Sequence, residues 1–369
     1  MKLIVISAVN LRKGGTLTIL QDCLHELSEL AQRGEYRVVA LVHRRYLADY
    51  PGIEYIEIPW SIRSWLHRLW CEHVTMHGIS RQLGDIDLWL SLHDTTPRVK
   101  ARCQAVYCHN SYPFFRWHWC HLWQNYRIVC FALFTRWIYR VNLHRNNFVI
   151  VQSQWFRDAF SQMTGFDKQR TIVFPPAAPP PTLPNKEGGG KSLSTFLYPA
   201  YPDVHKNIEC LCEAAEALER EMGIGRFEVR LTIAPSTNRY SRWLHDKWGH
   251  VSSIRFCGFL SKERLNILYA NTDCLVFPSC VETWGLPISE FSVTGRPMVL
   301  ADLPYAHETA AGCQRVAFFD PNDPNKLKEL MRDVLEGRTE HFKEVPDTPI
   351  SYPFASDWKQ IIASTASFQ

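Results

Sequence analysis

The sequence predicts an α/β protein with two domains, each built on a parallel sheet. Short apolar runs of strand length alternate with helical patterns along both halves of the 369 residues, and this alternation favours parallel strands joined by crossover helices. A stretch rich in Pro and Gly at residues 175–191 separates the halves and is typical of an interdomain linker. We therefore predict domains over residues 1–180 and 194–345, a linker over residues 181–193, and a C-terminal segment over residues 346–369.

The N-terminal domain begins as a Rossmann-like fold would begin. An apolar strand at residues 3–9 is followed by Gly14 and Gly15 and by a helical pattern over residues 16–32. Glycine lets a ligand approach the backbone, and a helix N-terminus attracts phosphate. The pair also fits a tight turn without a ligand, because a complete G-x-G-x-x-G is missing. Further strands are predicted at residues 37–42, 54–58, 88–92, 105–107, 149–151 and 171–174.

The second domain repeats the alternation of strands and helices. Lys206 stands just before one of its helices, where a cation opposes the helix dipole and favours an anionic partner, although a solvated lysine also fits. A later strand ends in a glycine turn at Gly258. Strands are predicted at residues 195–198, 229–234, 254–259, 274–277, 298–300 and 316–318, and helices at residues 208–221, 261–270, 288–293, 324–336 and 355–366.

Residues 274–312 of the second domain place two carboxylates where ligands bind in parallel sheets. The pattern predicts strand, loop, helix and strand, with Glu282 in the loop and Glu290 in the helix. Open α/β sheets bind ligands beyond the carboxyl ends of their strands, which is where this loop lies. Backbone amides between Gly285 and Ile288 would stand at the helix start and suit a phosphate.

Positive charge is concentrated in one region, although the net charge is only +4. Residues 95–157 contain many Arg and no Asp or Glu, and Arg and Trp are interleaved within residues 60–145. This region predicts contact with an anionic membrane surface or a lipid-linked acceptor. Packing of the aromatic residues into the core is the alternative. No nucleic-acid-binding module is recognisable, so we expect no nucleic-acid partner.

The sequence favours a reduced, cytoplasmic protein, placed peripherally on the inner face of the cell membrane by the basic aromatic region. It starts without the pattern of a signal peptide, and it has no uninterrupted apolar run of about 18 residues. The 12 cysteines have irregular spacing and no Cys-x-x-Cys pair. This spacing favours free thiols over disulfides or a zinc site, and we expect no bound metal.

Several motifs occur in the order found in the retaining glycosyltransferases of family 4, which the second domain resembles. They are Lys206-Asn207, Gly258-Phe259-Leu260, Phe277-Pro278-Ser279, the run Glu282-Thr283-Trp284-Gly285-Leu286-Pro287, Glu290, Gly295-Arg296-Pro297 and Glu308. The first domain matches less, at Gly14-Gly15, Tyr107-Cys108-His109, Ser153 and Pro175-Pro176. The resemblance implies the GT-B fold: two Rossmann-like domains face each other across a cleft, and a C-terminal helix, here that of Trp358, crosses back to the first domain.

The resemblance also implies an activity of the bacterial surface-polysaccharide type. A sugar would move from a UDP- or GDP-linked donor to a glycan or lipid-linked acceptor, with retention of anomeric configuration and without metal or other cofactor. Lys206 would neutralise the departing diphosphate, Glu282 would face the transferred sugar, and Glu290 would bind the ribose hydroxyls. His109 would join Lys206 and Glu282 as a catalytic residue. The implied donor-binding residues are Gly14, Gly15, Lys206, Gly258, Phe259, Leu260, Glu282, Thr283, Trp284, Gly285, Leu286, Pro287 and Glu290.

One position departs from the family pattern. The family has Arg five residues before the phosphate-binding Lys, where this sequence has Tyr201. Arg12, Lys13 and His205 are candidates to supply the missing cation. Two other readings of the residues stay open: a nucleotide-sugar epimerase or donor hydrolase with the same fold, and a non-catalytic protein that binds a sugar nucleotide.

Overall fold

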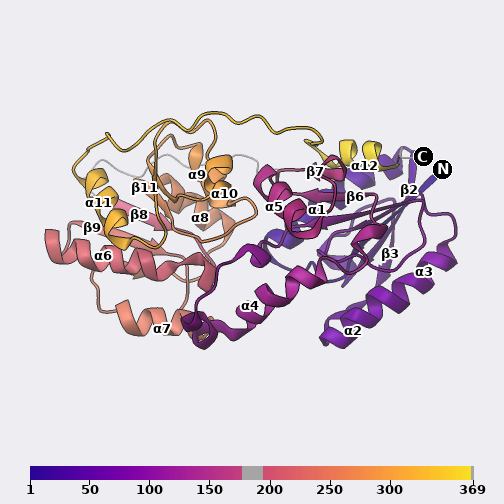
Figure 1. Cartoon of the computed structure of the whole chain (residues 1–369), viewed down its shortest axis with the longest axis horizontal. Coiled ribbons are helices and arrows are strands. Elements are labelled where there is room, and N and C mark those ends of the chain that lie inside the picture. The colour runs from indigo at the N-terminus through magenta and orange to yellow at the C-terminus, as the bar shows by residue number, and fades with distance from the viewer. Residues whose placement is uncertain (177–193, 367–369) are drawn as a thin grey trace. The chain divides into compact units, whose positions relative to one another are not determined.

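The computed structural model describes residues 1–176 and 194–366, and the chain forms two compact units, each with its own parallel sheet (Figure 1). Unit 1 comprises Met1–Asn110, Phe134–Ala177 and Ile350–Gln369, and unit 2 comprises Ser111–Leu133 and Ala178–Pro349. Residues 111–133 were predicted within the N-terminal domain, but they belong to unit 2. The predicted linker at residues 181–193 lies outside the described residues.

The sheet of unit 1 has seven parallel strands in the order β3-β2-β1-β4-β5-β6-β7. The strands are β1 (Lys2–Ala8), β2 (Tyr36–Val42), β3 (Ile53–Glu57), β4 (Leu88–Ser91), β5 (Cys103–Cys108), β6 (Phe148–Val151) and β7 (Thr171–Val173). The helices are α1 (Gly14–Gln32), α2 (Trp65–Trp70), α3 (Met76–Leu83), α5 (Gln154–Thr164) and α12 (Trp358–Ala366), with a π-helical turn, Cys71–Thr75, between α2 and α3. Helix α4 (Trp119–Ile138) begins in unit 2 and ends in unit 1.

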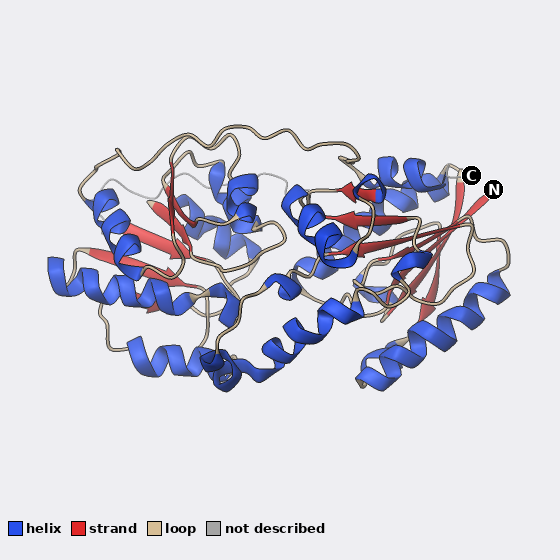
Figure 2. Cartoon of the chain, viewed as in Figure 1, coloured by secondary structure: helices blue, strands red, loops and turns tan. Residues whose placement is uncertain are grey.

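Strand β1 shows how the sheet of unit 1 is buried on both faces. Its side chains alternate between faces, as in any strand. Ile4 and Ile6 pack in the cluster that contains the leucines of α1, and Leu3 and Val5 pack in a second cluster with Cys71 and Met76 from the segment after α2. Helices therefore cover both faces of this sheet (Figure 2), as the continuous apolar strands predict.

Helix α1 begins two residues earlier than the sequence pattern predicts. Gly14 and Gly15 lie in its first turn, not in a separate turn before it, and Lys13 is the N-cap residue with extended backbone. Gly14 has a φ of 62°, a backbone conformation that favours glycine. The helix start remains next to the carboxyl end of β1, where the Rossmann-like pattern places it.

The C-terminal segment returns to unit 1, as predicted. Phe354 pairs with Val173 of β7, and Arg157 donates to the backbone oxygens of Ser351 (3.0 Å) and Pro353 (3.3 Å). Trp358 is buried and meets the ring of Phe174 edge-on, with 4.8 Å between ring centroids. The last helix thus completes the core of the N-terminal domain.

The sheet of unit 2 has six parallel strands in the order β10-β9-β8-β11-β12-β13. The strands are β8 (Ser194–Tyr198), β9 (Phe227–Leu231), β10 (Ile254–Phe256), β11 (Cys274–Phe277), β12 (Met298–Ala301) and β13 (Val316–Phe319). The helices are α6 (Ile208–Met222), α7 (Arg239–Trp248), α8 (Lys262–Ala270), α9 (Leu286–Ser292), α10 (Pro304–Thr309) and α11 (Pro324–Leu335). In the described part of the chain, no helix has both the length and the apolar character needed to cross a bilayer.

Candidate active site

The loop after β11 brings Lys206 and Glu282 together. Lys206 ends a short 3-10 turn, Val204–Lys206, that leads into α6, and its ammonium forms an ion pair with Oε1 of Glu282. The hydroxyl of Ser279 donates to the same oxygen at 2.7 Å. The two charged side chains are only 18% and 15% exposed. Burial makes such a pair strongly interdependent, because removing one partner leaves a poorly solvated charge.

The backbone of this loop is held from several sides. Tyr305 donates its hydroxyl to the oxygen of Ser279 at 2.7 Å, and the hydroxyl of Thr309 donates to the oxygen of Trp284. The indole of Trp284 donates to Ser289 at 2.8 Å. Gly285 precedes α9 with a φ of 95°, and a Cβ there would lie 3.2 Å from Cδ1 of Ile288. The turn that aims Glu282 therefore favours glycine at this position.

Glu290 is the second carboxylate of the predicted site, and it is buried. It lies on α9, is 8% exposed, and accepts a hydrogen bond from the hydroxyl of Tyr269 at 2.8 Å. The ammonium of Lys262 forms an ion pair with its other oxygen. Lys262 is the first residue of α8, directly after the turn of Gly258, Phe259 and Leu260. The sequence analysis overlooked Lys262, although its place after a glycine turn at a helix start was a usable signal.

The turn between β10 and α8 exposes one of the predicted donor-binding side chains. Phe259 is 90% exposed, and Gly258 has a φ of 75°. No side chain lies within 4 Å of the position that a Cβ of Gly258 would take. The backbone N–H of Gly258 donates to the oxygen of Ile233 at 3.1 Å, while the open space beside Gly258 and the exposed ring of Phe259 leave room for a flat ligand such as a nucleotide base.

The structure corrects one candidate for the missing cation near Lys206. His205 is buried, and this burial lowers its pKa well below the usual value, so the imidazole is neutral at physiological pH. Tyr201, which stands where the family pattern has Arg, is 53% exposed. Instead of a second cation, the turn holds an acid: burial raises the pKa of Asp203 to about 6, and Tyr112 donates its hydroxyl to this carboxyl at 3.4 Å.

Tyr112 also explains why residues 111–133 belong to unit 2. Its ring meets the imidazole of His205 edge-on at 4.9 Å, and Phe115 contacts the same imidazole at 6.1 Å. Farther along, the guanidinium of Arg239 lies 4.1 Å from the ring centre of Trp123. The aromatic residues after His109 therefore pack on the turn that carries Lys206, a contact that sequence spacing could not predict.

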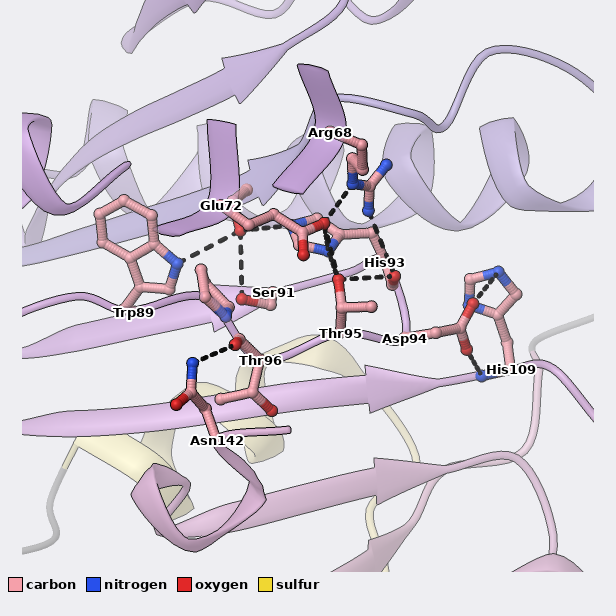
Figure 3. A network of polar contacts seen from close by, with 12 residues as sticks. Arg68, Glu72, Trp89, Ser91, His93, Asp94, Thr95, Thr96, His109 and Asn142 are labelled. Carbon is pink, nitrogen blue, oxygen red and sulfur yellow. Dashed lines mark hydrogen bonds and ion pairs between the residues drawn. The ribbon is translucent and has the colours of Figure 1, made fainter. Parts of the chain in front are cut away.

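His109 lies in unit 1, as do Gly14, Gly15 and two of the candidate cations, Arg12 and Lys13. It follows β5, and its side chain is 13% exposed. Its backbone N–H donates to Oδ1 of Asp94 at 2.7 Å, and its ring Nε2 lies 3.3 Å from Oδ2 of the same carboxylate (Figure 3). The remaining ring nitrogen, Nδ1, is buried without a hydrogen-bond partner in the structure. Sequence reasoning identified His109 but overlooked Asp94.

A buried polar network lies beside Asp94. Arg68 forms an ion pair with Glu72, whose Oε1 accepts a hydrogen bond from Thr95 at 2.8 Å. His93 lies 2.9 Å from the Thr95 hydroxyl through Nδ1 and 3.0 Å from Ser7 through Nε2. Burial lowers the pKa of His93 well below its usual value, so Glu72 and Arg68 are the charged members of the network. Among the described residues, no group of three or more His, Cys, Asp and Glu could hold a metal ion.

Comparison with known proteins identifies relatives of this chain. Residues 195–337 match the family described as glycosyl transferases group 1. O-antigen chain mannosyltransferase B of Escherichia coli is 31% identical over 147 residues, which cover 38% of this chain and 36% of the relative. The chain therefore matches about a third of the length of that curated relative.

Solved structures match the fold over nearly the whole chain. HepE of Anabaena, in complex with UDP and glucose, has a TM-score of 0.65 and 15% identity, covering 98% of this chain and 95% of that one. WaaG, a glycosyltransferase involved in lipopolysaccharide biosynthesis, has a TM-score of 0.62 and 16% identity, covering 90% of each chain. These similarities confirm the predicted GT-B fold with two parallel-sheet α/β domains.

Proposed function

We propose that the protein is a retaining, metal-independent glycosyltransferase. It moves a sugar from a UDP- or GDP-linked donor to a glycan or lipid-linked acceptor during the synthesis of a surface polysaccharide such as lipopolysaccharide. The observation that carries the proposal is the pairing of Lys206 with Glu282 and of Lys262 with Glu290 around one rigid loop. A sugar nucleotide carries a diphosphate that suits an ammonium and hydroxyls that suit a carboxylate.

In the proposed reaction, the bond between C1 of the sugar and the diphosphate oxygen breaks while C1 bonds to the acceptor oxygen on the same face. The acceptor proton passes to the departing phosphate. Negative charge grows on that phosphate, and Lys206 stabilises it. Glu282 holds the sugar hydroxyls, and Glu290 holds the ribose. The names of the relatives favour mannose as the sugar, and the ligands of HepE show that UDP-linked glucose belongs in the test panel.

We expect the full chain to be stabilised against thermal unfolding by one sugar nucleotide of a panel that includes GDP-mannose and UDP-glucose. A ligand that binds only the folded protein raises its stability by about 2.7 kcal/mol at 100 times its Kd. The same donor, radiolabelled in the sugar, should yield labelled acceptor extracted with lipid or polysaccharide. Release of free sugar or of an epimerised donor, without labelled acceptor, would favour the hydrolase or epimerase. Stabilisation with no turnover would favour a binding protein.

We further propose that unit 1 binds an anionic membrane surface through an aromatic face. This face consists of exposed apolar side chains on the segment of α2 and its π-helical turn and on the end of α4 and the residues after it. Leu66 is 78% exposed and Trp70 is 61% exposed. His73 lies 3.5 Å from Asn142, which places the two segments side by side. The members are Trp65, Leu66, Leu69, Trp70, Val74, Phe134, Trp137 and Val141.

The charge around the aromatic face suits anionic lipid. Arg63 and Arg136 are exposed within it. The only acid in residues 60–83 and 134–147 is Glu72, which is 2% exposed and paired with Arg68. Aromatic and aliphatic groups enter the lipid headgroup region, and arginines bind its phosphates. A cytoplasmic protein with this face would work peripherally at the inner surface of the membrane.

Replacing both Arg63 and Arg136 with Gln should weaken binding to vesicles containing phosphatidylglycerol by roughly 10-fold or more, because each such charge contributes about 1 kcal/mol near an anionic surface. Binding of the wild type should also decrease with added salt. Co-sedimentation with vesicles measures both effects. Arg226→Gln, an exposed arginine of unit 2, is the matched control. If neither added salt nor the double substitution changed the affinity for vesicles, this proposal would be contradicted.

A further inference from the structure

Asp94 has a backbone conformation that is uncommon outside glycine. Its φ is 65°, in the left-handed region that few residues other than glycine occupy. Such a conformation costs on the order of 1–3 kcal/mol and persists only where the surroundings enforce it. It therefore calls for a physical explanation, which its contacts supply.

The carboxylate of Asp94 is directed at His109. Oδ1 accepts the backbone N–H of His109 at 2.7 Å and a hydrogen bond from the hydroxyl of Tyr139 at 3.1 Å. Oδ2 lies 3.3 Å from the ring Nε2 of His109. One carboxylate thus contacts both the backbone and the ring of the histidine. The oxygen of Asn110 lies 2.8 Å from the same hydroxyl, whose single hydrogen is shared between the two acceptors, so the buried Tyr139 holds Asp94 and the residue after His109 together.

The residues on either side of Asp94 are anchored in the buried network. His93 contacts Ser7, and Thr95 donates to Glu72, which pairs with Arg68 (Figure 3). The backbone N–H of Asp94 itself donates to the oxygen of Tyr107 on β5 at 3.2 Å. Both neighbours and the amide of Asp94 are therefore fixed, which is how the surroundings impose the left-handed conformation.

We propose that Asp94 is a positioning residue for His109: its carboxylate orients the imidazole and fixes the tautomer with the proton on Nε2, while the Arg68–Glu72 network holds the backbone of Asp94. The inference rests on the proposed function only in taking His109 as the residue of unit 1 that meets the substrate. With the proton on Nε2, the buried Nδ1, which has no hydrogen-bond partner in the structure, keeps its lone pair as an acceptor. Without the carboxylate, either tautomer and either ring orientation is available.

The experiment uses the full chain labelled with ¹⁵N-histidine and compares wild type with Asp94→Asn. Asparagine tolerates the left-handed conformation and has nearly the same shape, but its amide places an N–H donor where Oδ2 of Asp94 faces Nε2. At pH about 8, ring ¹H–¹⁵N spectra should show His109 protonated on Nε2 in the wild type and shifted toward protonation on Nδ1 in the variant. His109→Gln assigns the signal. The kcat for transfer should decrease by about 10- to 100-fold, with the donor KM changed less than about threefold.

Two further variants separate positioning from folding. Asp94→Gly relieves the left-handed backbone, which offsets part of the cost of the lost carboxylate hydrogen bonds, so it should melt close to the wild type and lose as much kcat as Asp94→Asn. Asp158→Asn makes the same chemical change at an exposed carboxylate of unit 1 and should alter neither readout. Wild-type kcat and an unchanged His109 tautomer in both Asp94 variants would overturn the inference. The tautomer result stands even if no transferase activity is found, which would count against the proposed function alone.

Discussion

Lys206→Met should lower the kcat of sugar transfer by about 100- to 1000-fold, the loss seen when one preorganised group that stabilises a developing negative charge is removed. The diphosphate gains charge as the sugar departs, and the ammonium of Lys206 is the cation that unit 2 places beside Glu282. Affinity for the intact donor should decrease less, because the charge is greatest in the transition state. Initial rates over a range of donor concentrations separate the two quantities.

The chain offers controls for this experiment. Lys206→Arg keeps the charge and should retain more activity than the Met variant. Lys326→Met removes a lysine that pairs with Glu329 on α11, and its activity should match the wild type. Thermal melts are needed alongside, because Lys206→Met leaves Glu282 without its ion-pair partner. A Met variant that is folded and fully active would rule out the role given to Lys206.

Glu290→Gln should weaken binding of the nucleoside diphosphate by about 10- to 100-fold, because hydrogen bonds to a charged acceptor are worth roughly 1.5–3 kcal/mol. The glutamine oxygen can still accept from Tyr269, so the buried hydroxyl stays paired. The lost partner of Glu290, Lys262, is 54% exposed, and the effect on folding should therefore be small. Isothermal titration with UDP and GDP measures the affinity directly.

Glu282→Gln is the matched comparison, since it makes the same change on the same loop. We expect it to spare binding of the nucleoside diphosphate, within about twofold, and to slow transfer, because Glu282 is assigned to the sugar and not to the ribose. If both variants lost nucleotide affinity equally, the division of roles between the two carboxylates would be wrong.

Most strands were predictable because they are short apolar runs, whereas β3 and β9 intersperse charged residues among apolar ones. Every predicted strand is present, with bounds that differ by a few residues. Helix α7 was overlooked because its sequence is polar and aromatic, and its buried face consists of Tyr240, Leu244 and Trp248. Its start carried a signal that was available: Asn238 and Ser241 form a capping box. The packing of residues 111–133 on unit 2 was not predictable, because it depends on contacts between distant segments.

The parts of the candidate site that lie in one short motif were predictable from the sequence. The ion pairs between residues far apart in the sequence were not. The run from Glu282 to Glu290 is contiguous, so its loop and helix followed from the pattern. Lys262 was visible in the sequence as a cation at a helix start, but its pairing with Glu290 on a different helix follows from no spacing rule. Asp94 is an ordinary residue in the sequence, and its left-handed backbone appears only once the network around it is in place.

The segment formed by α2 and its π-helical turn has an exposed apolar side and a buried charged side. Trp65 and Trp70 are exposed, whereas Arg68 and Glu72 point inward and hold the loop of Asp94. If this segment binds lipid and its position affects His109, the two events are thermodynamically linked. By thermodynamic reciprocity, if the active arrangement of His109 strengthens membrane binding, then membrane binding favours that arrangement by the same free energy. An assay without vesicles would then measure a lower transfer activity than an assay with vesicles.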